Sequence, residues 1–172
     1  MCPLARGRTY AVAYRGAPRP WLVLVGEAPG AEEDRQGLPF VGRAGRLLDR
    51  TIAAVGLGSD DYGIVNVLKC RPAQNRFDPD AAEACRPYLD RQLALLAPSA
   101  LVTLGARALA ALDPGALPML RSAGVERLRA GTPLFPMIHP AAAMRSRRWA
   151  ERWTHDLRAF RRWWERRETQ TS

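Results

Sequence analysis

Four short apolar runs, separated by stretches of helical spacing, constrain the fold of this chain more than any other feature. They read WLVLVG at 21–26, GIVNVLKC at 63–70, ALVTLG at 100–105 and TPLFPMIHP at 132–140. Runs of this length and composition are typical of strands buried on both faces and followed by loops. Strands that alternate with helices predict an α/β fold. We therefore expect a three-layer αβα sandwich around a short, mainly parallel four-stranded sheet.

The segments between these runs predict helices. Apolar side chains at helical spacing predict them over 43–55, from Asp78 or Asp80 to about Leu96, and over 106–112. Glu83 follows Asp80 by three residues, as in a capping box. The stretch 27–42 is rich in Gly, Pro and acidic residues, so it is too irregular to predict an element and too acidic for a phosphate-binding loop.

The C-terminal stretch 147–167 predicts a long amphipathic helix. Its large apolar side chains follow steps of three and four residues and form one stripe, namely Trp149, Trp153, Leu157, Phe160 and Trp164. Such a stripe favours packing against the sheet. The alternative is an aromatic and basic surface that stacks on nucleic acid. Trp163 lies off the stripe, and the spacing assigns it no role.

Length and hydropathy favour a single domain over 1–172. The chain has 172 residues, of which 47% are hydrophobic and 25% charged. No apolar run approaches the ~18 residues that a membrane span requires, and no signal-peptide pattern is present. We therefore expect a cytoplasmic monomer with no membrane partner, associated with the nucleoid if the source is a prokaryote.

The charge balance suits a polyanionic partner. Lys and Arg number 26 against 17 Asp and Glu, which gives a net charge of +9. Such an excess favours DNA or RNA binding. However, Lys69 is the only lysine, so the excess of arginine also fits a bias toward GC-rich codons. Charge alone leaves both explanations open.

The ends of the predicted strands indicate where reactive side chains would lie close together. Loops begin at Gly26, around Asn66 to Cys70, and at His139. The carboxyl ends of parallel strands meet at one edge of a sheet, and ligands bind there in open α/β folds. We therefore expect the active groups on these three loops.

The same three loops carry a family resemblance. GEAPGAEEDRQGLPFVGRAG follows the first strand, NVLKCRPAQNR the second and HPAAAMR the last. In order and spacing these motifs resemble those of the family 4 uracil-DNA glycosylases, over a stretch from Cys2 to about Arg145. The resemblance implies an enzyme that hydrolyses the N-glycosidic bond of uracil in single- or double-stranded DNA. It would leave an abasic site and so initiate base excision repair.

The resemblance also implies roles for single residues. Phe40 is similar to the residue that stacks on the extruded uracil, beside Gly26 in the binding site. Asn66 resembles the residue that reads the base, because an amide offers a donor and an acceptor that match uracil O4 and N3–H. His139 resembles the donor that stabilises the departing uracil anion, as an oxyanion hole would. A neutral imidazole suffices for that role.

Water activation is less clearly assigned. Glu27 resembles the residue that holds the attacking water, while Ala28 stands where the family 1 enzymes carry an aspartate. Glu33 and backbone carbonyls are therefore alternatives to Glu27. The family counterpart of Glu33 pairs with an amide like Asn75 and fixes the loop.

The segment after His139 resembles the loop that enters the DNA minor groove. Family members place a leucine in this loop, whereas this chain has Ala142, Ala143 and Met144. Met144 is the only sizeable candidate for the wedge that props the flipped state. A weak wedge predicts a preference for single-stranded or mismatched substrate.

The three cysteines can be interpreted in two ways. By count alone, three thiols in a reducing compartment are inert and buried. The resemblance instead implies a 4Fe-4S cluster held by Cys70, Cys85 and Cys2, the last as the second half of a C-x-x-C pair. The fourth ligand is missing from this chain. Either the start was assigned too late, or one ligand has been lost and another group replaces it.

Two rival hypotheses remain. The first is a catalytically silent, DNA-binding or iron-sulfur paralogue of the same fold. The second is a nucleotide-binding module, in which a strand, a glycine-containing loop and a helix follow one another in the same order. GEAPGAEED lacks the glycine spacing of nucleotide-binding motifs and places carboxylates where phosphates would bind, so the second has little support.

Overall fold

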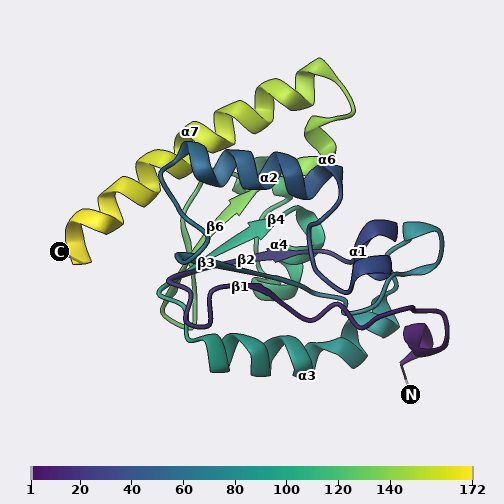
Figure 1. Cartoon of the computed structure of the whole chain (residues 1–172). Coiled ribbons are helices and arrows are strands. Elements are labelled where there is room, and N and C mark those ends of the chain that lie inside the picture. Colours follow the sequence, from purple (N-terminus) through teal and green to yellow (C-terminus); the bar gives the residue numbers. More distant parts are fainter. Residues whose placement is uncertain (1, 172) are drawn as a thin grey trace.

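A single six-stranded sheet, in the order β1-β3-β2-β4-β6-β5, runs through the middle of the computed structural model (Figure 1). The structure describes residues 2–171 and the side chains of residues 2–167, so Met1 and Ser172 of the predicted domain lie outside it. The strands are β1 (Arg15–Gly16), β2 (Leu22–Gly26), β3 (Tyr62–Asn66), β4 (Ala100–Leu104), β5 (Arg127–Arg129) and β6 (Thr132–Met137).

The four predicted strands are the four central ones. β2 pairs in parallel with β3 and β4, and β4 pairs in parallel with β6. The expected α/β fold is therefore confirmed. β1 and β5 add short antiparallel edges that the sequence did not predict. β3 ends at Asn66, where the second loop was expected to begin, and β6 ends at Met137, two residues before His139.

Helices cover both faces of the sheet (Figure 1). They are α1 (Ala31–Gln36), α2 (Arg43–Ala54), α3 (Pro79–Leu96), α4 (Ala106–Leu112), α5 (Met119–Ser122), α6 (Pro140–Ala143) and α7 (Arg147–Thr171), with 3-10 turns at Pro3–Arg6 and Ala73–Asn75. None of the described helices is long and apolar enough to cross a membrane.

Alternation along the central strand separates two cores. Leu22 and Leu24 of β2 pack with side chains of α2 and α7, while Val23 and Val25 pack with those of α3 and α4. This two-residue period is the geometry of a pleated strand covered on both faces. The layers fix β2 and its C-terminal loop in the middle of the molecule.

The helix α1 corrects the expectation of an irregular 27–42 stretch. Glu33 accepts a hydrogen bond from the backbone N–H of the N-cap residue Gly30, which is the half of a capping box that a glycine N-cap allows. Gly37, with φ of 74°, ends the helix in a left-handed conformation that glycine adopts without strain. A helix of six residues has no apolar periodicity, so its sequence gave no helical signal.

The apolar stripe of α7 is buried, as core packing requires. Trp153, Phe160 and Trp164 are each at most 5% exposed. Trp163, to which the spacing assigned no role, is 1% exposed and donates from its indole Nε1 to the Glu126 carboxylate at 2.8 Å. The buried face of α7 is therefore wider than one stripe.

Candidate active site

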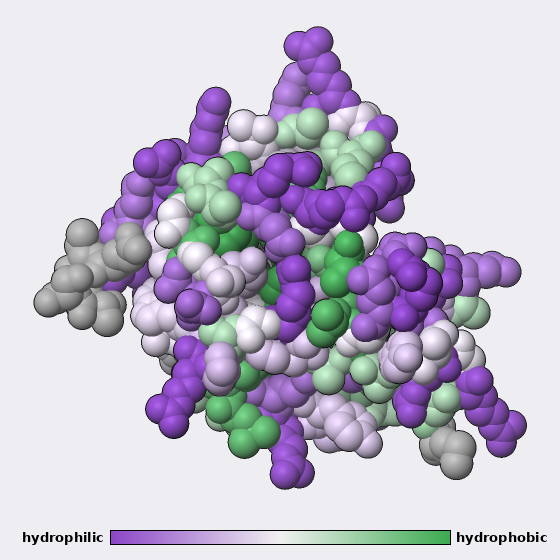
Figure 2. Space-filling view, in the orientation of Figure 1, coloured by the Kyte–Doolittle hydropathy of each residue, from purple (hydrophilic) through white to green (hydrophobic). Residues whose placement is uncertain are grey.

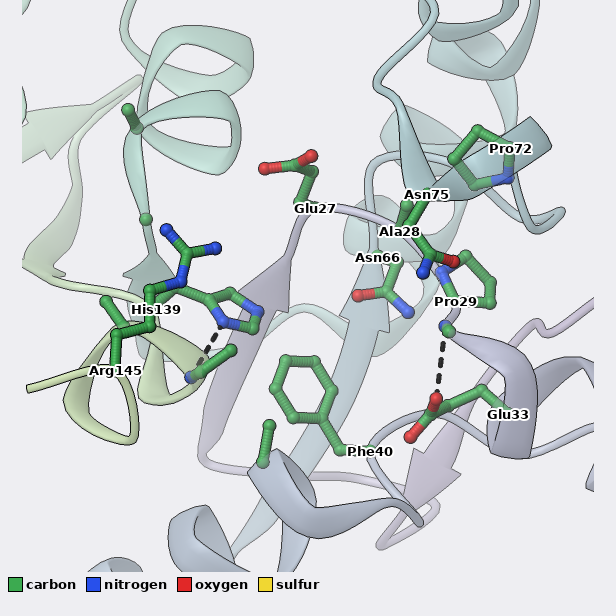
Figure 3. A pocket seen from close by; sticks show the side chains of 16 residues that line it. Glu27, Ala28, Pro29, Glu33, Phe40, Asn66, Pro72, Asn75, His139 and Arg145 are labelled. Carbon is green, nitrogen blue, oxygen red and sulfur yellow. Dashed lines mark hydrogen bonds between the residues drawn. The ribbon is translucent and has the colours of Figure 1, made fainter.

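A cavity of about 490 Å³ opens at the C-terminal edge of the parallel strands (Figure 3). Its lining comes from the loop after β2, from α1 and α2, from the end of β3 and the loop that follows it, from the loop after β4 and from the segment after β6. The predicted residues that line it are Glu27, Ala28, Glu33, Phe40, Asn66, Asn75 and His139, and the lining also includes Pro29, Gly30, Gly105 and Arg145. The structure thus brings together residues that lie up to 118 positions apart (145 − 27) in the chain.

Asn66 presents an unused amide to this cavity. The residue ends β3 and is 1% exposed. Neither Nδ2 nor Oδ1 has a hydrogen-bond partner among the described residues, although both atoms are buried. An unpaired buried polar atom costs about 1 to 3 kcal/mol, so native structures rarely keep one without a purpose. Here a donor and an acceptor stand ready for a ligand.

The ring of Phe40 lies beside this amide and near His139. The Phe40 and His139 ring centroids are 5.6 Å apart. Phe40 has φ of 55°, a left-handed conformation that costs a non-glycine residue on the order of 1 kcal/mol. Such strain at a cavity wall is typical of a side chain held for function.

Two glycines make room for this arrangement. A Cβ on Gly26 would lie 2.4 Å from Asn66 Oδ1 and 2.5 Å from the Phe40 ring. A Cβ on Gly45 would lie 1.7 Å from the Phe40 carbonyl oxygen. Gly26 was expected in the binding site, whereas Gly45 was missed, because a glycine within a helical pattern gives no sign of what approaches it.

His139 is neutral and carries a usable donor. It caps α6, and its Nδ1 accepts a hydrogen bond from the backbone N–H of Ala141 at 3.1 Å. Burial lowers the pKa of His139 to about 4, and the positive charge of Arg145 contributes to the lowering. A neutral imidazole that accepts at Nδ1 carries its hydrogen on Nε2.

The position of His139 is supported from α7. Asp156 is fully buried, and its Oδ2 accepts a hydrogen bond from the backbone N–H of Ile138 at 3.1 Å. Arg152 donates to the other carboxylate oxygen at 2.8 Å and so balances the buried charge. Sequence reasoning missed Asp156, because a carboxylate among the many charges of α7 looks like a solvated residue.

Glu27 lies half-buried at the cavity, directly after β2. Burial raises the pKa of this carboxyl above its ordinary value of 4.5, although the positive charges of Arg107 and Arg145 oppose the shift. A carboxylate with a raised pKa is a better proton acceptor than one in water. The arrangement can therefore hold and deprotonate a water molecule.

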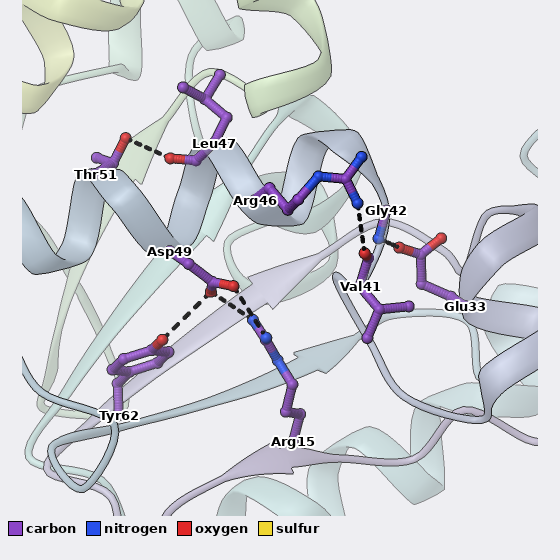
Figure 4. A network of polar contacts seen from close by, with 9 residues as sticks. All are labelled: Arg15, Glu33, Val41, Gly42, Arg46, Leu47, Asp49, Thr51 and Tyr62. Carbon is purple, nitrogen blue, oxygen red and sulfur yellow. Dashed lines mark hydrogen bonds and ion pairs between the residues drawn. The ribbon is translucent and has the colours of Figure 1, made fainter.

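Glu33 fixes the loop in a different way from the one expected. Its carboxylate accepts from the backbone N–H groups of Gly30 at 3.0 Å and Gly42 at 2.8 Å (Figures 3 and 4). The expected pair with Asn75 is not among the hydrogen bonds of the described residues, and Asn75 Oδ1 instead accepts from Arg71 at 2.9 Å. Two backbone donors occupy both oxygens of Glu33, which favours a positioning role over water activation.

Met144 lies at the C-terminal end of α6. Its side chain is 45% exposed, and it does not line the cavity. An exposed apolar side chain beside a cavity mouth has the placement that a wedge needs. Whether it enters DNA stays a prediction.

The three cysteines lie in one region of the described structure. Cys2 packs against a small buried cluster that contains Cys85, and Cys70 Sγ accepts a hydrogen bond from Arg8 at 3.3 Å. Burial raises the pKa of Cys85, and the charges of Cys2 and Cys70 act in the same direction. The described residues hold no group of three or more Cys, His, Asp or Glu arranged to bind a metal. The implied 4Fe-4S cluster takes four thiolate ligands and stays a prediction of the resemblance.

Comparisons with a family model and with individual proteins place the chain in the same family. A model of the uracil DNA glycosylase superfamily matches residues 13–166. The chain is 39% identical to the type-4 uracil-DNA glycosylase of Thermotoga maritima, over 85% of this chain and 78% of that protein. It is 40% identical to that of Saccharolobus solfataricus, over 83% and 71% of the two chains.

Other relatives are matched over less of their length. The type-4 uracil-DNA glycosylase of Sulfurisphaera tokodaii is 50% identical over 60% of this chain, but the match spans only 48% of that protein. The chain thus spans about half the length of some of its curated relatives and more than two thirds of others.

Proposed function

Because the chain belongs to the uracil-DNA glycosylase superfamily and within it to the type-4 enzymes, we propose that it hydrolyses the N-glycosidic bond of uracil in DNA and leaves an abasic site. The unpaired, buried amide of Asn66 at the cavity is the observation that carries the proposal. This amide needs a ligand that offers an acceptor and a donor side by side.

Uracil meets that need and cytosine does not. The Asn66 Nδ2 would donate to uracil O4, and Oδ1 would accept from N3–H. Cytosine presents a donor and an acceptor in the opposite order, so it would face like groups. The Phe40 ring offers an apolar face against which an extruded base can stack. Gly26 keeps both side chains in place, since any larger residue would collide with them.

Bond cleavage needs charge stabilisation at two points. As the C1′–N1 bond breaks, its electron pair leaves with uracil, and the neutral His139 donates from Nε2 to uracil O2. A water held by Glu27 adds to the cationic C1′, and its proton passes to the Glu27 carboxylate. The uracil anion then takes a proton from solvent and Glu27 returns its proton to solvent, which completes the hydrolysis.

The pH dependence follows from these two groups. Glu27 must be ionised to accept the proton, so kcat is expected to fall on the acid side with a midpoint above pH 4.5. His139, with a pKa of about 4, stays neutral through this range. Glu27→Gln should therefore remove the acid limb and leave a residual rate that is flat from about pH 5 to 8. An inflection near pH 6.5 that persists in Glu27→Gln would contradict the neutral histidine.

The strand preference follows from the short α6 segment. If Met144 is the wedge, its single side chain offsets only a small part of the free energy needed to unstack uracil from a duplex. Single-stranded uracil is expected to react faster than a U:A pair. Met144→Ala should slow duplex cleavage roughly tenfold, which corresponds to about 1.4 kcal/mol, and leave single-strand cleavage unchanged. A U:A rate well above the single-strand rate in the unmodified protein would contradict the weak wedge.

The net charge of +9 supports sequence-independent contacts with DNA phosphates. Figure 2 shows hydrophilic residues over most of one face, with hydrophobic groups in small patches between them. We propose that the protein acts as a monomer on nucleoid DNA. The 4Fe-4S cluster stays a prediction of the family resemblance, and no step above depends on it.

The proposal is tested by incubating the purified protein with a uracil-containing oligonucleotide and measuring free uracil and abasic-site cleavage. Oligonucleotides with thymine or cytosine at the same position serve as controls. Release of uracil alone supports the proposal. Binding without release on any strand type would favour the silent paralogue.

A further inference from the structure

The mouth of the cavity carries one cation that the steps above do not use. Among the described residues that line the cavity, Arg145 alone has a fixed positive charge. Its side chain is exposed and has no hydrogen-bond or ion-pair partner among the described side chains. Figure 3 shows its guanidinium beside His139, facing the side of the cavity where Glu27 lies. Arg145 is therefore free to bind something that arrives with the substrate.

A second arginine reaches the same region from another element. Arg107 lies in the first turn of α4, directly after the cavity residues Gly105 and Ala106. Its guanidinium is stacked over the Phe77 ring, 4.8 Å from the ring centroid. The stack restrains a long side chain before any ligand is present, which lowers the entropic cost of using it.

The carboxylates at this mouth explain why cations are needed. Glu27 and Glu33 both line the cavity and repel a polyanion. The positive charges of Arg107 and Arg145 both lower the pKa of Glu27. The two guanidinium groups, one on α4 and one after α6, therefore lie close enough to interact electrostatically with the same carboxylate. An extruded nucleotide brings two backbone phosphates to the rim while its base enters the cavity.

We propose that Arg145 and Arg107 form a clamp for the backbone phosphates that flank the extruded nucleotide. Guanidinium groups bind phosphate oxygens through paired, charge-assisted hydrogen bonds. The clamp would hold the flipped state from outside the cavity and so compensate for the weak apolar wedge at Met144. This inference rests on the proposed uracil excision, because it needs a nucleotide whose base enters the cavity.

The test measures DNA binding apart from cleavage. The probe is a labelled single-stranded oligonucleotide with one 2′-fluoro-deoxyuridine, whose fluorine disfavours a cationic sugar and keeps the base attached. Fluorescence anisotropy across about 0.05 to 0.2 M salt gives the Kd and its salt slope. The variants are Arg145→Gln, Arg107→Gln and their combination. Arg162→Gln is the matched control, because this exposed arginine lies on the half of α7 that leads away from α6 (Figure 1).

Each clamp variant is expected to bind roughly tenfold more weakly and to reduce the salt slope by about 0.7. In uracil release the loss should appear in KM, with kcat falling by less than twofold and inhibition by free uracil unchanged. Arg162→Gln should change the Kd by less than twofold. A tenfold loss in kcat at unchanged Kd would overturn the clamp, because the arginines would then act on the leaving base. Equal weakening by Arg162→Gln would overturn it too.

The clamp and the proposed function fail in different ways. If the unmodified protein releases no uracil, the proposed function fails, whatever the variants do. If it releases uracil while the clamp variants bind the probe as tightly as the unmodified protein, the clamp alone fails.

Discussion

His139→Ala is expected to lower kcat for uracil release by about 100- to 1000-fold, which corresponds to about 2.7 to 4 kcal/mol of lost transition-state stabilisation. The loss should fall on kcat, because the Nε2 donor meets its full partner only when charge has developed on uracil O2. Single-turnover cleavage of a uracil-containing oligonucleotide measures it directly.

The control for this variant is His155→Ala. His155 is the only other histidine, and its side chain is 68% exposed on α7. It should cleave at the unmodified rate. A kcat for His139→Ala within tenfold of the unmodified protein would contradict the assigned role.

Asn66→Leu is expected to lower kcat/KM by roughly 100- to 1000-fold without lowering the thermal stability. The variant removes two hydrogen bonds to the base, and a site built around such bonds rejects a partner that cannot make them. The folded protein gains in the same step, because Leu replaces an amide whose buried Nδ2 and Oδ1 have no partner. Activity should therefore fall while Tm stays constant or rises, which is the signature of a residue kept for function.

Thr103→Val is the matched control for this combination of lost activity and undiminished Tm. Thr103 is fully buried on β4, and its hydroxyl also has no hydrogen-bond partner among the described residues, yet it does not line the cavity. It should raise or preserve Tm and preserve activity. If Asn66→Leu loses activity only in proportion to a fall in Tm, the amide is structural and the base-reading role is wrong.

The sequence predicts the fold where burial leaves a periodic pattern. The central strands are apolar runs because both faces are covered, and the stripe of α7 is visible because one face of a long helix is buried. Asp78 caps α3 through the backbone N–H of Ala81, which decides between the two predicted caps. The short edge strands β1 (Arg-Gly) and β5 (Arg-Leu-Arg) contain no buried residue, so they leave no pattern to detect.

The residues of the candidate site likewise fall into those that the sequence predicts and those that it does not. Residues that act through their own side chains, such as Asn66 and His139, are recognisable from motifs at strand ends. Residues that act through the backbone of others are not. Asp156 supports Ile138 from 18 positions away, and Gly45 leaves space for the Phe40 carbonyl. Both depend on tertiary packing, which no local pattern records.

The most direct test of the account is the rate of free uracil release from a single-stranded oligonucleotide with one deoxyuridine, measured under single-turnover conditions for the unmodified protein, Asn66→Leu and Thr103→Val. The account predicts release by the unmodified protein and by Thr103→Val, and a loss of roughly 100-fold or more in Asn66→Leu at undiminished Tm. No release by a folded, DNA-binding unmodified protein, on single-stranded or duplex substrate, would contradict it.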